Sequence, residues 1–68
     1  MPNVKLQAPK GKYRVVGVDT FDGDDWVQGD FDTLENARTV AEKKGGIMTK
    51  MHIYDDSGTH RGEAGIFG

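Results

Sequence analysis

Short apolar blocks alternate with polar turn segments along the chain, and the spacing of apolar positions inside each block predicts its secondary structure. Residues 12–18 (KYRVVGV) are rich in β-branched and aromatic side chains and are too few for a stable helix. Residues 26–31 (WVQGDF) alternate with a period of two, which places Val27 and Phe31 on one side and Trp26 and Gln28 on the other. We therefore expect two strands, joined into a hairpin by the turn-forming residues 19–25.

A helix is expected over residues 33–44. Asp32 or Thr33 can cap its first turn, because either side-chain oxygen can accept a hydrogen bond from a free backbone amide. Gly45 is expected to end the helix in the left-handed conformation. A single narrow apolar stripe predicts that the helix covers one side of a sheet. That stripe consists of Leu34, Ala37, Val40 and Ala41.

Two more strands are expected after the helix. Residues 47–54 (IMTKMHIY) alternate again, with Ile47, Met51 and Ile53 on one side. Residues 55–58 (DDSG) are typical of a hairpin turn with glycine in the last position. The turn leads into a fourth strand over residues 59–67, which two glycines weaken.

This order of elements predicts an α+β fold. We expect a two-layer β-β-α-β-β arrangement, in which one helix packs on one face of a mainly antiparallel four-stranded sheet. The usual right-handed crossover predicts the strand order 4-3-1-2. A small curved barrel with one helix is the alternative, because glycines occur in the strands. Residues 1–11 hold both prolines and few apolar positions and are expected to form a weakly ordered N-terminal arm, with residues 12–68 making a single domain.

Composition narrows the class of protein. The 68 residues contain no cysteine, begin without an apolar leader and hold no run long enough to span a membrane. We therefore expect a cytoplasmic protein that does not bind membranes. The net charge is −2, but residues 19–35 contain seven acidic and no basic side chains, while both flanks are mainly basic. The surface is expected to be electrically two-sided.

Few residues could carry catalytic chemistry. A calcium loop starting at Asp22 is excluded by spacing, since its fifth position is Trp26 rather than an oxygen ligand. Nucleophilic catalysis would depend on Ser57, the only serine, which lies in a turn with no helix after it. We therefore expect no enzymatic activity and no cofactor.

Two histidines flank the 55–58 turn. His52 and His60 can face each other across the predicted hairpin, and Asp56 or Glu63 could add a third ligand. The spacing fixes no ligand geometry, so the favoured interpretation is two surface histidines and no metal site.

The sheet face opposite the helix is the candidate binding site. The residues expected to point toward the helix are Val16, Val18, Val27, Phe31, Met51 and Ile53. The opposite face would then carry Tyr13, Val15, Trp26, Gln28, Lys50, His52 and Tyr54. An uncovered surface with three aromatic rings is typical of a protein-binding surface. We interpret the chain as a small protein-interaction or self-associating module, whose partner is another protein or a second copy. Alternatively, the arm folds over this face through Val4 and Leu6.

Weak binding of single-stranded nucleic acid is the second functional hypothesis. Aromatic rings on a four-stranded sheet can stack on bases, and basic side chains could line one edge of the sheet. These are Lys10, Lys12, Arg14 and Lys50. The net charge of −2 disfavours a nucleic-acid platform, which is usually basic.

Three stretches between Lys12 and Phe67 carry a resemblance: YRVVGVD, GDFDTLENA and HIYDDSG. In this pattern the chain resembles small uncharacterised bacterial proteins with a β-β-α-β-β arrangement. The resemblance implies the fold and carries no functional residue over to this chain.

Overall fold

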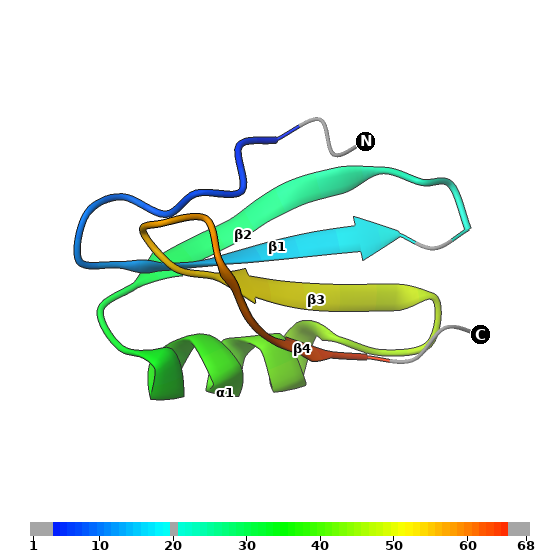
Figure 1. Cartoon of the computed structure of the whole chain (residues 1–68). Helices are drawn as coiled ribbons and strands as arrows, with labels where there is room; N and C mark the ends of the chain where they lie inside the picture. Colours follow the sequence, from blue (N-terminus) through cyan, green and yellow to red (C-terminus); the bar gives the residue numbers. More distant parts are fainter. Residues whose placement is uncertain (1–3, 20, 66–68) are drawn as a thin grey trace.

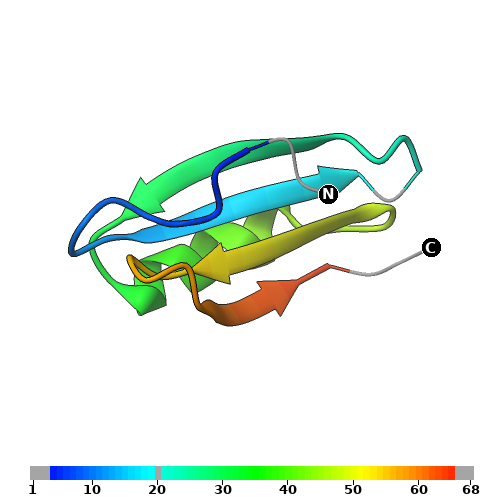
Figure 2. The same ribbon diagram turned by 45° about the horizontal axis from the view of Figure 1, so that its top comes forward.

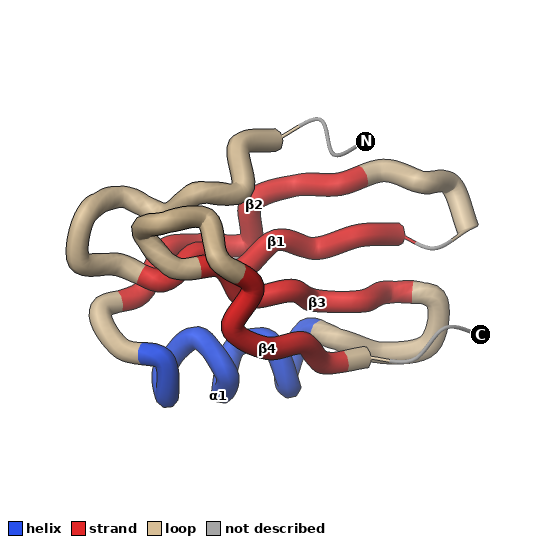
Figure 3. The backbone as a smooth tube through the Cα atoms, in the orientation of Figure 1, coloured by secondary structure: helices blue, strands red, loops and turns tan. Residues whose placement is uncertain are grey.

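The fold is a two-layer α+β arrangement. The computed structural model describes residues 4–19 and 21–65, and Figure 1 shows the helix lying against one face of the sheet. The elements are β1 (Tyr13–Asp19), β2 (Asp25–Phe31), α1 (Leu34–Lys44), β3 (Thr49–Tyr54) and β4 (His60–Ala64). All neighbouring strands are antiparallel, in the order β2-β1-β3-β4 (Figure 3). The predicted fold class and strand order are confirmed, and the sheet is open rather than a barrel.

The last two strands are shorter than predicted. Strand β3 begins at Thr49, because Ile47 and Met48 form a tight turn that the backbone hydrogen bonds between Gly46 and Thr49 close. Met48 has a φ of 69°, in the left-handed region that few residues other than glycine adopt. Strand β4 ends at Ala64, and residues 66–67 of the predicted strand lie outside the described residues.

The helix begins where the capping residues predict. The Thr33 hydroxyl accepts a hydrogen bond from the Asn36 amide at 3.0 Å, which satisfies one free donor of the first turn. At the other end the prediction for Gly45 is wrong, since its φ of −69° and ψ of 149° are extended. Glycine is required there for space instead, because a Cβ would lie 2.9 Å from the Ala41 carbonyl oxygen. The absent side chain lets the helix end approach the end of β4.

The hydrophobic core lies between α1 and the sheet. Its buried members are Val15, Ala37, Ala41, Met51 and Ile53, and partly buried side chains surround them: Tyr13, Trp26, Phe31, Leu34 and Ala64. Two alanines on the helix stripe allow α1 to lie close to the strands. We call this side of the sheet the helix side.

Trp26 belongs to the helix side, where its indole ring lies over Gly17. A Cβ on Gly17 would come within 2.5 Å of the ring, so only glycine leaves the indole enough room. Gly29 has the same relation to the Phe31 ring, at 2.9 Å. Both large rings of β2 therefore pack over glycines, on the side of the sheet that faces the helix.

The N-terminal arm crosses the opposite side of the sheet, as Figure 2 shows. The Ala8 amide donates to the Asp55 carbonyl oxygen at 3.0 Å, and the Gln7 side-chain amide donates to the Asp56 carbonyl oxygen at 2.6 Å. Ala8 itself is only 4% exposed. The arm lacks helix and strand in its described part, yet it is bonded to the β3–β4 turn. We call the side that the arm crosses the arm side. Of the two predictions for this face, an uncovered surface or a face crossed by the arm, the structure has the second.

In the described part of the chain, α1 is the single helix, and its eleven residues are too few and too polar to cross a bilayer.

Candidate functional site

The seven residues predicted to share one face are divided between the two sides of the sheet. Tyr13, Val15 and Trp26 lie on the helix side, so their predicted placement is wrong. The side-chain oxygen of Gln28 accepts a hydrogen bond from the Trp26 indole N–H at 3.1 Å. The other three lie on the arm side: Lys50, His52 and Tyr54. Whether these residues bind a partner stays a prediction.

A β-bulge explains the wrong placement in β2. Val15 pairs with Gly29 and Val16 pairs with Val27, so Gln28 is an extra residue without a partner position. The extra residue shifts the alternation by one, and Trp26 and Phe31 come to lie on the same side although five positions separate them. Val27 is thereby turned away from the helix, opposite to its prediction.

In β1 the alternation itself is uninformative. Val15 and Val16 are adjacent, point to opposite sides, and are 0% and 1% exposed. Because both sides of β1 are apolar, a period of two cannot tell which side faces the helix. Val16 and Val18, predicted to face the helix, instead line a groove on the arm side.

This groove has a volume of about 260 Å³ and draws its lining from four parts of the chain. Val16 and Val18 come from β1, His52 and Tyr54 from β3, and Leu6 from the arm. Gly23 and Asp25 complete it near the β1–β2 loop. The result is a mainly apolar recess with a carboxylate, an imidazole and a phenol at its border.

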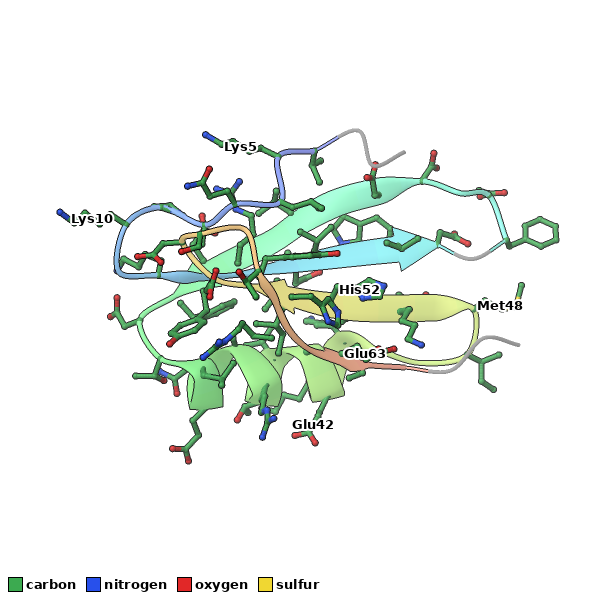
Figure 4. All side chains as sticks on the ribbon, viewed as in Figure 1. Lys5, Lys10, Glu42, Met48, His52 and Glu63 are labelled. Atoms are coloured by element: carbon green, nitrogen blue, oxygen red, sulfur yellow. The ribbon has the colours of Figure 1, made fainter. Side chains whose placement is uncertain are left out.

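Two histidines meet beside the groove. His52 Nδ1 lies 3.0 Å from His60 Nε2, so the prediction that they face each other across the hairpin is confirmed. The Tyr54 ring completes the group, with its centroid 5.3 Å from that of His60 and nearly perpendicular to it. Glu63 on β4 lies directly opposite His52 on β3 in the register of the two strands (Figure 4). One ligand atom of each of His52, His60 and Glu63 lies within 4.8 Å of the others, and we call these three residues the histidine cluster.

A second bulge brings His60 to this side. Glu63 pairs with His52 and Gly62 with Ile53, but His60 pairs with Tyr54, which leaves Arg61 as the extra residue. With regular alternation His60 would point to the helix side, three positions from Glu63. The irregularity in β4 is therefore what places both ligand types on the arm side.

Charges around the cluster set its protonation. Burial lowers the pKa of His52, and the nearby His60 and Lys50 lower it further against an opposing effect of Glu63. Lys50 forms an ion pair with Glu63, and the hydrogen bond from Lys50 is the main cause that lowers the pKa of this carboxyl group. Burial, followed by the Glu63 charge, raises the pKa of Tyr54. At neutral pH these shifts favour a neutral His52 beside an ionised Glu63.

Arg14 connects the arm to β1 and β2. Its guanidinium donates two hydrogen bonds to Asp30, at 2.7 and 3.1 Å, and a third to the Lys5 carbonyl oxygen at 2.9 Å. The hydrogen bond to Asp30 is the main cause that raises the pKa of Arg14. The bond to Lys5 holds the arm to the sheet, and the two charge-assisted bonds to Asp30 join β1 to β2.

A second candidate surface lies at one end of the sheet. Asp19 at the end of β1 pairs with Thr49 at the start of β3, so the loops that carry Phe21 and Ile47 leave the sheet at the same end (Figure 1). Phe21 is 78% exposed and Ile47 is 75% exposed, the highest values among the described large hydrophobic residues. We call these two residues the apolar end. The sequence pattern does not reveal it, because the pattern predicts a turn at Phe21 and a strand at Ile47.

Comparison with known proteins identifies no relative: no protein-family model, curated protein or solved structure matches the chain significantly. The resemblance to small bacterial β-β-α-β-β proteins therefore stays a prediction.

Proposed function

We propose that the chain is a protein-interaction module that binds a second copy of itself through the apolar end. The observation that carries the proposal is the exposure of Phe21 and Ile47 in two loops at one end of the sheet. Large apolar side chains gathered on a surface contribute most to association when a partner excludes water from them.

The segments that carry Phe21 and Ile47 contain, or directly follow, exposed charges of opposite sign. Asp22 and Asp24 are exposed in the loop of Phe21, whereas Lys43 and Lys44 are exposed in the last helical turn, just before Ile47. In a two-fold symmetric dimer the same surface meets itself, so the acidic loop of one copy can lie against the lysines of the other. This self-complementarity favours a second copy over an unrelated protein.

The sheet face is a weaker candidate for the same role. Trp26 and Tyr13 pack against the core, and the arm lies across the opposite side. Stacking of nucleic-acid bases would depend on these rings, so we do not propose that function.

The lack of cysteine in the sequence suits a reducing compartment, and we keep a cytoplasmic location as part of the proposal.

Sedimentation velocity over a wide range of chain concentrations tests the proposal. We expect the wild-type chain to dimerise as its concentration rises, and the double variant Phe21→Ser with Ile47→Ser to stay monomeric. At a chain concentration low enough for the wild type to be monomeric, circular dichroism and the thermal midpoint should be unchanged in the double variant, since both side chains are exposed. Raising the salt concentration should weaken the wild-type dimer, because exposed charges are screened.

Val27→Lys is the matched control. Val27 is 39% exposed on the edge strand β2, where copies could instead pair edge to edge. The control should dimerise like the wild type. A wild-type chain that remains monomeric at every concentration would contradict the proposal, and so would a dimer that Val27→Lys abolishes and the double variant retains.

A further inference from the structure

We propose that His52, His60 and Glu63 bind one divalent transition-metal ion, with Zn²⁺ as the best fit. Two nitrogens bound to the same Zn²⁺ at about 2.0–2.1 Å lie about 3.3–3.4 Å apart in the tetrahedral geometry that zinc prefers. The observed separation of His52 Nδ1 and His60 Nε2 is 3.0 Å. The two nitrogens need to move apart by only about 0.3 Å to reach the spacing of two zinc ligands.

The third ligand comes from the same hairpin. Glu63 lies directly opposite His52, and its carboxylate oxygen falls within the 4.8 Å that encloses all three ligand atoms. Two imidazoles with one carboxylate suit zinc and similar metals, whereas calcium and magnesium require more oxygen ligands. Three protein ligands leave a fourth position open for water or for a bound molecule. His52 also lines the arm-side groove, so a molecule in the groove would lie close to the ion.

The pairing of β3 with β4 fixes the backbone positions of the three ligand residues before any ion binds. His52 is half-buried on β3, while His60 and Glu63 are exposed on β4 and open to solvent. The Asp55 side chain accepts the backbone amides of Ser57 and Thr59 at 2.9 Å each, which holds the turn between the strands. Because the two strands are already paired, metal binding has to order side chains only, and the backbone loses little further conformational entropy.

Lys50 opposes metal binding. Its ammonium group forms an ion pair with Glu63 and adds a positive charge beside the proposed ion. A bound ion must draw the Glu63 carboxylate at least partly away from Lys50. Lys50 should therefore affect zinc binding if Glu63 is a ligand. It should affect binding much less if the two histidines bind zinc without a carboxylate.

Calorimetric titration of the full, chelator-stripped chain with Zn²⁺ tests the proposal, with Mg²⁺ as a comparison. We expect one Zn²⁺ per chain at every chain concentration, and shifts of both histidine resonances in NMR spectra. His60→Ala should weaken binding at least tenfold, since even the outer partners of metal ligands contribute about 10- to 100-fold. His60 is exposed, so this variant should keep its fold.

Two further variants separate the site from histidine binding alone. Glu63→Gln should weaken Zn²⁺ binding about tenfold, whereas Glu35→Gln, an exposed glutamate on the helix, should leave it unchanged. Lys50→Gln should tighten binding about threefold by removing one nearby charge. Equal affinities of Glu63→Gln and Glu35→Gln would overturn the proposal. So would an absence of Zn²⁺ binding to the wild-type chain, in which case the 3.0 Å contact is a hydrogen bond between the two imidazole rings.

These results do not depend on the proposed dimer. The histidine cluster lies on the arm side of the β3–β4 hairpin, and the double variant at Phe21 and Ile47 should bind Zn²⁺ as the wild type does.

Discussion

The two sides of the sheet bury neighbouring residues of β1 by different means. On the helix side Val15 is covered by side chains of α1 and by two aromatic rings of β2. On the arm side Val16 is equally buried, but the segment that crosses this side has no regular structure and is held by hydrogen bonds to a turn. One helix can fill only one side of a small sheet with side-chain packing. The other side retains a groove, ion pairs and the histidine cluster.

This comparison implies that stability resides mainly on the helix side, and removing a large ring from each side tests it. Trp26→Ala should lower the free energy of unfolding by about 3 kcal/mol, because the ring is packed in the core. Tyr54→Ala on the arm side should cost clearly less, since its ring borders an open groove. Urea unfolding followed by far-ultraviolet circular dichroism measures both. A larger loss for Tyr54→Ala would reverse the comparison.

The packing of Trp26 over Gly17 gives a sharper test of the helix side. Gly17→Ala should cost about 2 kcal/mol, because the new methyl group overlaps the indole ring. Gly46→Ala makes the same chemical change where a Cβ meets nothing within 4 Å, and should stay within about 0.5 kcal/mol of the wild type. Thermal or urea unfolding compares the two variants. Equal effects would mean that the indole does not occupy the space above Gly17.

The arm side can be broken at its most buried residue. Ala8→Gln should cost about 1–2 kcal/mol, because a longer polar side chain cannot fit where Ala8 is 4% exposed. Lys10→Gln introduces the same residue at an exposed position of the arm and should change stability by less than about 0.5 kcal/mol. Urea unfolding measures both variants. If Ala8→Gln were as stable as Lys10→Gln, the arm would not be packed on the sheet.

The smallest expected effect concerns the turn that anchors the arm. Hydrogen bonds from the Thr59 amide, then from Ser57, lower the pKa of Asp55. A carboxyl group with a lowered pKa stabilises the fold above its unfolded pKa of about 3.9, and this contribution is lost as the pH falls through the folded pKa. Asp55→Asn should therefore lose less stability than the wild type between neutral pH and strong acid.

Asp22→Asn, in the exposed loop, is the control for this pH dependence and should follow the wild type. Urea midpoints measured across the pH range give the comparison. An acid dependence of Asp55→Asn identical to that of the wild type would contradict a role of the ionised carboxylate in the turn.

The sequence predicts where helix and strands lie better than it predicts which face of the sheet each strand residue points to. Thr33 marks the start of the helix chemically, and the alternation over β3 places Met51 and Ile53 correctly on the helix side. Both faces of β1 are apolar, so its orientation has no signal in the pattern. In β2 and β4 the extra residues Gln28 and Arg61 shift the alternation, and single bulges are invisible to a simple period of two.

The same irregularities limited prediction of the candidate site. The histidines were recognised as a pair across a turn, but only the bulge at Arg61 determines that Glu63 shares their side. Gly17 and Gly29 were a usable signal, because a strand glycine indicates close approach of a neighbouring group. Here the neighbours are the rings of Trp26 and Phe31.

The most direct test of which side holds the aromatic core is an NMR measurement of contacts from Trp26, the only tryptophan. With the indole stacked on Gly17, the α-protons of this glycine should be shifted upfield by the ring current and should show strong nuclear Overhauser effects to the indole. Contacts from the indole to Leu6 or Tyr54 on the arm side, with ordinary Gly17 shifts, would contradict the account.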